Sequence, residues 1–276
     1  MKETVKITIL CEDQAKMGNK NKVFLAQHGF SAFVEAGKRV LLDAGSTDVY
    51  MHNAKLLGID LASTDLIMLS HGHWDHTDGL KVWPEKGFPR IPLLAHPGVF
   101  VDRHKATGEY NGIYCSREEL NEKFELIPSK EPYRMTDTMF FLGEIPRAND
   151  FEAQKTSFYC LDKGEKRQDY VLDDTALAVR TAEGLVIVSG CSHSGVCNIV
   201  EYARQVTMEQ RVHAVVGGFH LLGDPVQRER TIDFFMRNPV DHLCPMHCTD
   251  LPSLSEFYQA FGIEKLCAGD SIVFDT

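Results

Sequence analysis

Runs of apolar residues predict several strands in the first part of the chain. Residues 5–10 alternate apolar and polar side chains, as expected for a strand with one buried face. Residues 26–35 and 39–43 are two further apolar runs, and the short turn between them predicts a hairpin. Residues 64–69 end in four consecutive apolar side chains, which is typical of a strand buried on both faces.

Helix signals follow two of these strands. A helix is expected at residues 46–57, with Ser46 or Thr47 as its N-cap and Gly58 at its end. A second, short helix is expected to start at Gly79, just beyond the strand at residues 64–69.

The later part of the chain repeats this order of strands and helices. Residues 176–181 and 185–189 predict a hairpin like the first one. The other expected elements are strands at residues 91–97, 139–142, 214–221, 242–249 and 271–274, a loop or hairpin at 154–170, and helices at 196–205 and 254–261.

Two similar halves of strands followed by helices predict an α/β fold. No linker rich in Pro, Gly or Ser separates the halves. We therefore expect a single domain over residues 1–276, built as a four-layer αββα sandwich of helices, sheet, sheet and helices. Residues 99–135 show less pattern and are interpreted as an irregular excursion, either a cover over a binding pocket or a plain surface connection.

Composition narrows the classes of partner. The 276 residues are 43% hydrophobic and 25% charged, with a formal net charge of −10. An acidic chain without clusters of Lys, Arg and aromatic residues argues against nucleic-acid binding. We therefore expect a small-molecule substrate, with no nucleic-acid partner, and we leave a homodimer open.

The eight cysteines and the N-terminal residues favour a cytoplasmic location. The cysteines are scattered without a CxxC pair, so free thiols are expected rather than a disulfide framework. Residues 1–5 lack an apolar signal core, and no apolar run approaches the length of a membrane span, so no membrane contact is expected.

The strongest chemical signal lies directly after the strand at residues 64–69. Four metal-ligand side chains fall within six residues, namely His71, His73, Asp75 and His76. They occupy a loop beyond the carboxyl end of a strand, where open α/β sheets place their chemistry. Imidazole with carboxylate suits zinc, and it also suits iron or manganese, so a metal site is predicted, with two divalent ions favoured.

Further histidines follow the later strands. His193, His220 and His247 each come at or just beyond the end of an apolar run. A single histidine in such a place is commonly structural, but three of them predict convergence on the site of the His71–His76 loop.

Other polar residues receive more ordinary interpretations. Cys244 and Cys248 are interpreted as small packing residues, and His96 as part of a turn. Arg147, after a predicted strand, is a candidate substrate contact for an anion, with a solvated surface charge as the alternative.

The histidine loop resembles a known signature. His71-Gly72-His73-Trp74-Asp75-His76 is similar to the His-x-His-x-Asp-His motif of the metallo-β-lactamase superfamily. The similarity extends to residues 41–45, 143–147, 190–195, 217–221 and 247–249. Together these segments resemble a subgroup that includes an archaeal dihydropterin-ribofuranosyl-aminobenzene-phosphate synthase of methanopterin synthesis and many metal-dependent hydrolases.

This resemblance implies roles for three residues outside the loop. Asp43 would support the metal loop from behind. Cys191 stands where the superfamily often has a bridging Asp, so either Cys191 ligates as a thiolate, or His193 takes over as ligand, or the second ion is weakly held. Asp174 could fill the ligand position left open there or, like Asp43, support the ligands without binding the metal. Asp250 departs from the Gly expected after His247-Cys248-Thr249.

Three functions are consistent with these residues. The first is hydrolysis of a small ester, lactone or phosphoester by metal-activated water, with Asp75 and His76 as the catalytic residues. The second is a pterin-linked transferase like the methanopterin-pathway synthase. For that reaction the rings that could stack on a planar substrate are Phe24, Phe30, Tyr110, Tyr114 and Phe219. The third is a metal-binding sensor without catalysis.

Overall fold

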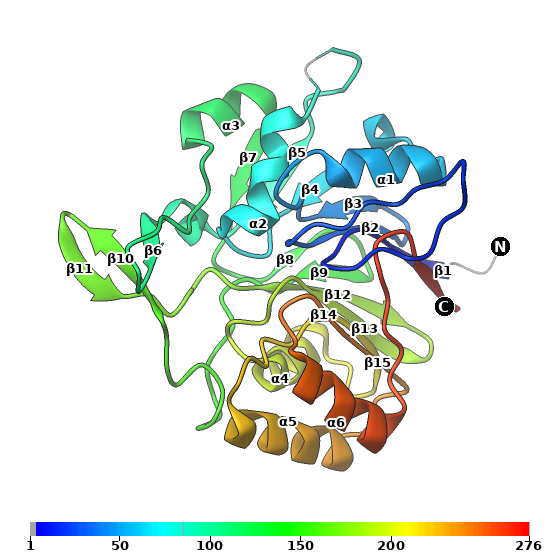
Figure 1. Ribbon diagram of the computed structural model, residues 1–276, viewed down its shortest axis with the longest axis vertical. Helices are drawn as coiled ribbons and strands as arrows, with labels where there is room; N and C mark the ends of the chain where they lie inside the picture. Colours follow the sequence, from blue (N-terminus) through cyan, green and yellow to red (C-terminus); the bar gives the residue numbers. More distant parts are fainter. Residues whose placement is uncertain (1–3, 85, 276) are drawn as a thin grey trace.

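The first sheet of the sandwich carries the histidine loop. The computed structural model describes residues 4–84 and 86–275. Within them a seven-stranded sheet has the order β16-β1-β2-β3-β4-β5-β7 (Figure 1). Its strands are β1 (Thr4–Cys11), β2 (Ser31–Glu35), β3 (Arg39–Leu42), β4 (Leu66–Met68), β5 (Pro92–Ala95), β7 (Glu125–Pro128) and β16 (Ser271–Asp275). Strands β3, β4, β5 and β7 pair in parallel, so their carboxyl ends meet at one edge.

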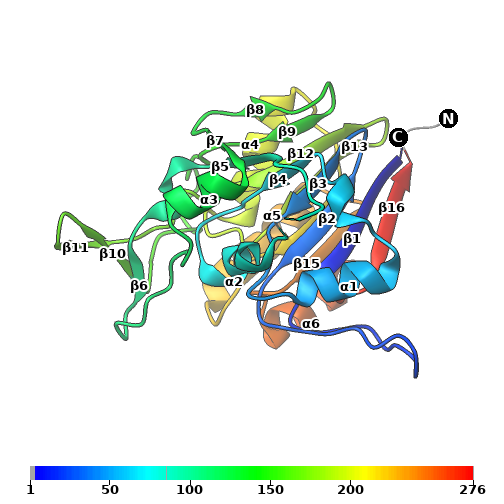
Figure 2. The ribbon, with the colours of Figure 1, turned by 90° about the horizontal axis from the view of Figure 1, so that it is seen from above.

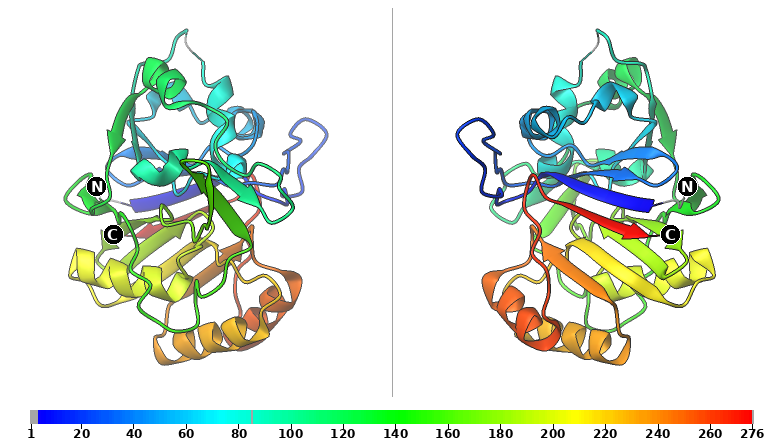
Figure 3. Two further views of the ribbon diagram at one scale, coloured as in Figure 1. Left: turned by 90° about the vertical axis from the view of Figure 1, so that its left-hand side faces the viewer. Right: turned by 90° about the vertical axis from the view of Figure 1, so that its right-hand side faces the viewer.

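The second sheet repeats this arrangement and faces the first. Its six strands have the order β15-β14-β13-β12-β9-β8. They are β8 (Tyr133–Arg134), β9 (Met139–Phe141), β12 (Ala176–Thr181), β13 (Gly184–Ser189), β14 (Val212–Gly218) and β15 (His242–Met246). Strands β13, β14 and β15 are parallel, which again brings their carboxyl ends together. The last strand, β16, crosses back to pair with β1 in the first sheet (Figure 3).

Helices cover the outer face of each sheet, which completes four layers (Figure 1). On the first sheet lie α1 (Val49–Leu57), α2 (Trp74–Thr77) and α3 (Arg117–Lys123), with the 3-10 turns η1 (Leu61–Ser63), η2 (Asp78–Val82) and η3 (Pro97–Phe100). On the second lie α4 (Val196–Thr207), α5 (Pro225–Arg237) and α6 (Leu251–Phe261). The observed architecture confirms the predicted four-layer αββα fold.

Burial of both sheet faces explains the continuous apolar runs. Val186 and Val188 of β13 pack in the core between the two sheets, together with Ile7 of β1. Leu185 and Ile187 of the same strand point the other way, into the core under the second set of helices. A strand covered on both sides has no solvent-facing positions, so its sequence shows no alternation.

A small third sheet forms an arm at one side of the sandwich (Figures 1 and 2). It consists of β6 (Arg103–Lys105), β10 (Phe158–Asp162) and β11 (Glu165–Gln168) in the order β11-β10-β6. The stretch at 99–135, expected to be irregular, contains β6, α3 and β7, and β7 extends the edge of the first sheet beside β5. The single-domain prediction for residues 1–276 is not tested by these observations.

Several predicted boundaries are wrong because side chains near them bind elsewhere. Strand β2 begins only at Ser31, since the segment before it packs against the histidine loop. Helix α1 begins at Val49, because Ser46 Oγ donates to the His28 carbonyl and Thr47 Oγ1 to Gln27 Oε1 instead of capping the helix.

Four helices differ from the prediction. Helix α2 was not predicted, whereas the short helix expected from Gly79 is present as η2, which begins at Asp78. Helix α6 begins at Leu251 because the Asp250 carboxylate caps it by accepting from the Ser253 N–H. Helices α3 and α5 were not predicted, although a capping box and an Asp-Pro pair mark their starts. Among the helices of the described residues, none is long and apolar enough to span a membrane.

Candidate metal centre

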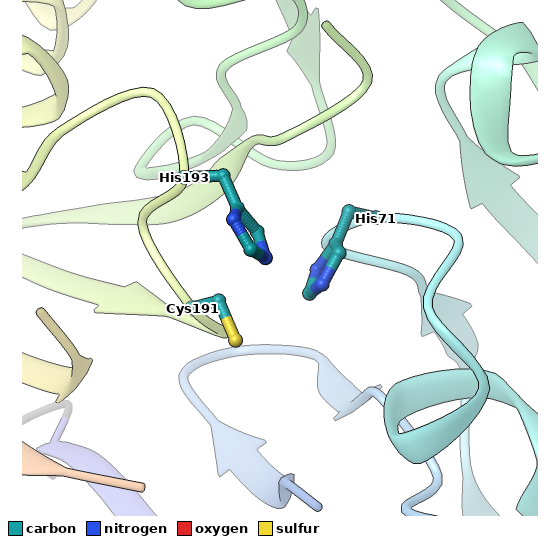
Figure 4. A group of neighbouring side chains, drawn as sticks. All are labelled: His71, Cys191 and His193. Atoms are coloured by element: carbon teal, nitrogen blue, oxygen red, sulfur yellow. The ribbon is translucent and has the colours of Figure 1, made fainter. Parts of the chain in front are cut away.

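Five strand ends from the two sheets meet at one place. Asp43 directly follows strand β3, and β4 leads into the loop that carries His71, His73, Asp75 and His76. From the facing sheet, β13 delivers Cys191 and His193, while β14 and β15 deliver His220 and His247. Figure 4 shows His71 and His193 pointing toward each other from opposite sheets, with the Cys191 thiol beside them.

A first group of candidate ligand atoms is formed by His71, His73, Cys191 and His193. Single ligand atoms of His71, Cys191 and His193 all lie within 4.8 Å of one another. His71 Nε2 is 3.0 Å from His73 Nδ1, and the His193 ring lies 4.7 Å from the His73 ring. All four side chains are buried, so these nitrogen and sulfur atoms face one another rather than water.

A second group lies next to the first and shares Cys191. His76, Cys191 and His247 have ligand atoms within 4.8 Å of one another, and Cys191 Sγ is 3.2 Å from His76 Nε2. Asp75 Oδ2 is 3.5 Å from His247 Nε2 and 3.7 Å from His76 Nε2. The thiol therefore occupies the position between the two groups.

Hydrogen bonds behind the loop fix the tautomers of the imidazoles. Asp43 Oδ2 accepts from His76 Nδ1–H at 2.7 Å and from the Ser70 hydroxyl at 2.6 Å. Because Ser70 gives its only proton to Asp43, its oxygen accepts from His71 Nδ1–H, 2.9 Å away. Both imidazoles are thereby left with a free Nε2 lone pair directed at the centre, which is the form that binds a metal.

Burial and neighbouring charges leave the imidazoles of His71 and His73 neutral and the Asp75 carboxylate charged. Burial, and then the neighbouring imidazoles, hold the pKa of His71 well below its usual value, and burial with Arg103 does the same for His73. Burial alone would raise the pKa of Asp75, but His76 and His247 outweigh it and lower this pKa. Neutral imidazoles beside a carboxylate are the ligand states that a divalent cation requires.

Unpartnered buried nitrogens show that these residues fit a metal. His73 Nε2, His193 Nε2 and His220 Nδ1 are buried without a hydrogen-bond partner. A buried polar atom without a partner is costly, and an ion among the ligand atoms would supply the partner of His193 Nε2. Imidazole, carboxylate and thiol donors suit zinc or iron, so the donor set agrees with the geometry.

Cys248 and His220 form a third contact with the centre. Together with Cys191 they place ligand atoms within 4.8 Å of one another, and the His220 ring lies 4.1 Å from that of His193. Cys248 is buried, as the packing interpretation expected, but its thiol also donates to the Cys191 carbonyl at 3.2 Å, whereas Cys244 lies in the core between the sheets. His220 and His247 both adopt positive φ, a strained conformation that is concentrated at functional sites.

Two predicted site residues form hydrogen bonds with the loops around the centre. Asp174 is not a member of the ligand groups; its Oδ2 accepts from the Ser194 N–H and hydroxyl, which fixes the loop that carries His193. Arg147 donates to the carbonyls of Tyr170 and Val171. The contacts of Asp174 agree with a supporting role beside the ligands, and the contact of Arg147 with an anion stays a prediction.

Sequence reasoning missed a buried cation that supports the histidine loop. Arg103 of β6 is 1% exposed and places its guanidinium 2.6 Å from Asp173 and 3.1 Å from Asp169. Asp173 Oδ2 also accepts from the backbone N–H of Gly72, between the two first histidines. The arm thus ties down the loop through an ion pair whose partners lie about seventy residues apart in sequence.

Asp13 and His28 were also missed. Asp13 Oδ1 lies 3.1 Å from His247 Nδ1 and 3.2 Å from His28 Nδ1. Asp13 comes from an irregular polar loop, and its contact with His247 spans 234 residues, so no local pattern could have indicated it.

A cavity of about 540 Å³ opens beside the centre. Its wall includes His193 and His220, so a molecule in it would meet the candidate ligands directly. Side chains of several chemical kinds line the rest, among them Phe151, Lys155, Phe158, Tyr170 and Arg230.

Comparisons with known proteins place this geometry in a family. Residues 27–104 match the model of the metallo-beta-lactamase superfamily. The crystal structure of Tm1679, a metal-dependent hydrolase of the beta-lactamase superfamily, superposes with a TM-score of 0.86 at 30% identity, covering 99% of this chain and 100% of that one. The chain belongs to the metallo-β-lactamase superfamily.

Two archaeal relatives cover nearly the same length. The uncharacterized protein MJ0448 of Methanocaldococcus jannaschii is 36% identical over 86% of this chain and 90% of its own. The 7,8-dihydropterin-6-methyl-4-(beta-D-ribofuranosyl)-aminobenzene-5'-phosphate synthase of the same organism is 34% identical over 99% of this chain and 97% of its own. The resemblance to this subgroup of the metallo-β-lactamase superfamily is thus confirmed.

Proposed function

We propose that the protein is a hydrolase that holds two divalent ions, preferably zinc, and cleaves a small ester, lactone or phosphoester. The observation that carries this proposal is the pair of buried ligand groups joined by the Cys191 thiol. His71, His73 and His193 would hold the first ion, and Asp75, His76 and His247 the second, with Cys191 between them as a thiolate. Ions bound there would supply Lewis acidity and would lower the pKa of a bound water toward about 7.

The chain's own groups would orient the substrate and move protons. Asp75 is 7% exposed and ionised, so its carboxylate can accept the proton of an attacking water. Asp43 holds His76 Nδ1 and keeps Nε2 facing the centre. We assign His220 to substrate contact, because it borders the cavity and lies outside the two main ligand groups.

The cavity supports an enzyme more than a sensor. Its volume of about 540 Å³ falls in the usual range for small-molecule sites, and His193 forms part of its wall. A sensor would need the ligands but no such space beside them. The same volume supports a small molecule as the substrate.

A pterin-linked transferase is the second candidate, favoured by the relative that is named as a synthase and matches 99% of the chain. Two of the rings expected from sequence, Phe30 and Phe219, are fully buried in hydrophobic cores, and the other three do not line the cavity. Phe158 is better placed, since it lines the cavity and its ring lies 4.9 Å from that of His73.

The test combines metal content with a substrate panel. Elemental analysis of the purified protein should give two ions per chain. Chelation should abolish hydrolysis within a panel of esters, lactones and phosphoesters, and zinc or manganese should restore it. His71→Ala should behave like the chelated protein, whereas His104→Ala, which changes a histidine on the arm, should remain active.

Two results would decide against hydrolysis. Full activity of the chelated protein would exclude the metal-based mechanism. Quenching of pterin fluorescence by the metal-loaded protein, with no turnover anywhere in the panel, would favour the transferase.

A further inference from the structure

His28 lies at the solvent-facing side of the second ligand group. It belongs to the segment between β1 and β2, and 61% of its side chain is exposed. Its Nε2 is 3.3 Å from Asp75 Oδ2, and its ring lies 5.1 Å from that of His247. Although 47 residues separate it from Asp75 in the sequence, it reaches the same carboxylate oxygen as the buried histidines.

Three imidazole nitrogens surround that oxygen at similar distances. Nε2 of His28, His247 and His76 lie 3.3, 3.5 and 3.7 Å from Asp75 Oδ2. Two neighbouring ligand atoms of one zinc ion, each bonded at 2.0–2.1 Å, are about 2.9–3.6 Å apart in four- or five-coordinate geometry. The nitrogen of His28 falls within this range.

The three imidazoles are also oriented in the same way, each by a hydrogen bond at Nδ1. Each has its Nδ1 beside a carboxylate, which turns Nε2 toward Asp75. Asp43 Oδ2 lies 2.7 Å from Nδ1 of His76, while Asp13 Oδ1 lies 3.1 Å from Nδ1 of His247 and 3.2 Å from Nδ1 of His28. A carboxylate behind an imidazole is the usual companion of a histidine that binds a metal.

The backbone on either side of His28 is fixed against the histidine loop. The Phe30 N–H donates to the Asp75 carbonyl at 3.2 Å, and the Gly29 N–H donates to Asp13 Oδ1 at 3.3 Å. A Cβ on Gly29 would stand 2.3 Å from the Asp75 carbonyl oxygen, so only glycine permits this close approach. The exposed imidazole is therefore held on a rigid segment.

We propose that His28 is an additional ligand of the second ion. This inference rests on the proposed two-ion function. The second ion would then be bound by three imidazoles and the Asp75 carboxylate, with the Cys191 thiolate on its inner side. His28 would be the ligand on the open side, where solvent has access to the ion.

The test compares His28→Ala and His28→Gln with a matched control. His52→Ala removes another exposed histidine, on α1, whose Nε2 lies 3.0 Å from the Val23 carbonyl oxygen. Dissociation constants for the two zinc ions are measured by competition with a chromophoric chelator. Both His28 variants should bind the first ion unchanged and the second at least tenfold more weakly, whereas His52→Ala should match the unmodified protein.

A spectroscopic measurement separates a ligand from a supporting residue. In the cobalt(II)-loaded protein, every bound imidazole with a protonated Nδ1 gives a strongly shifted, exchangeable proton resonance in the NMR spectrum. At cobalt concentrations that fill both sites, His28→Ala should lack one of these resonances.

The outcomes distinguish this inference from the proposed function. Fewer than two ions in the unmodified protein would overturn the two-ion function itself. Two ions with unchanged dissociation constants in both His28 variants would overturn only the role of His28. Weaker binding with a full set of shifted resonances would also overturn it as a ligand.

Discussion

At the scale of single residues, the thiol of Cys191 sets this centre apart. It lies between the two ligand groups, where the superfamily often has a carboxylate, and its sulfur is 3.2 Å from His76 Nε2. A thiolate is a softer and larger donor than a carboxylate, so it favours zinc or iron over manganese. The identity of this one side chain should therefore influence both affinity and metal preference.

Replacement of Cys191 tests this expectation. Cys191→Ala should lower zinc affinity at least tenfold, because both groups lose their shared donor, and Cys191→Asp should shift the preference from zinc toward manganese. Cys244→Ala is the control, since it removes a thiol from the core between the sheets. Competition titrations with both metals provide the measurement. Equal zinc affinities in all three variants would show that Cys191 does not bind the ions.

The buried thiol of Cys244 should make stability depend on alkaline pH. Burial raises the pKa of Cys244 from 9.0 to about 12. Between these values the unfolded chain loses the proton while the folded chain keeps it, so stability is full below pH 9 and falls as pH rises toward 12. Because one pKa unit corresponds to about 1.4 kcal/mol, this thiol should cost about 1 kcal/mol between pH 8 and pH 10.

Urea unfolding at these two pH values checks the size and sign. The unmodified protein should lose about 1 kcal/mol more stability than Cys244→Ala over this interval, since other buried groups act equally in both proteins. A variant that loses as much stability as the unmodified protein would show that Cys244 is not responsible.

The residues found from sequence are those that lie close together in it. His71, His73, Asp75 and His76 fall on one loop after one strand, so their spacing alone indicates a metal site. Asp13 and His28 carry no such pattern, because their contacts with His247 and Asp75 span more than forty residues of the chain. The position of the Cys248 thiol beside Cys191 was not expected either, because the sequence does not show which side chains near the end of a strand face the site.

At the scale of elements, the N-terminus of helix α4 is capped by a side chain from a distant segment of the chain. Its N-cap residue, Gly195, has no side chain and a φ of 98°, so it cannot cap the helix. Glu152, from the loop after β9, takes that role by accepting from the Cys197 and Asn198 N–H groups at 2.9 Å. The carboxylate is fully buried, and it therefore fixes the start of α4 just after His193.

Loss of this cap should be costly. Glu152→Ala should lower the free energy of unfolding by about 2–3 kcal/mol, because two buried N–H groups lose their carboxyl acceptor. Glu152→Gln keeps an oxygen acceptor and should lose less. Glu201→Ala changes a half-exposed carboxylate on the same helix and should stay within about 0.5 kcal/mol of the unmodified protein. Urea unfolding measures all three, and a Glu152→Ala loss no larger than that of Glu201→Ala would contradict the capping role.

Strands were easier to predict than helix starts. Apolar runs such as the one in β13 indicated nearly every strand of the two large sheets, because both faces of those strands are buried. Helix starts depend on which side chains are free to cap. Ser46 and Thr47 bind the neighbouring loop instead, and sequence gives no sign of that competition.

At the scale of the whole molecule, the ligands come from both sheets. The first sheet supplies His71 to His76, and the second supplies Cys191, His193 and His247. The three hydrophobic cores are built from other side chains, so the fold does not depend on the ions alone. Ions bound here would add to stability without being its source.

Metal removal should therefore weaken the fold without destroying it. With free zinc at one hundred times its dissociation constant, a bound ion adds about 2.7 kcal/mol to the free energy of unfolding. Chelation should lower the melting temperature while circular dichroism still reports folded sheets and helices. His71→Ala should show a smaller response to added zinc. A melting temperature unaffected by chelation would show that the folded chain gains nothing from metal.

The supply of ligands from both sheets also bears on the order in which the protein assembles. His76 and His247 are separated by 171 positions along the chain, yet both approach the same oxygen of Asp75. Contacts between such distant positions form late, because a long loop of chain must close first. Until then, the free thiols and imidazoles of the unfolded chain offer zinc many incorrect combinations. The two sheets would have to pack against each other before an ion could reach the site that both of them build.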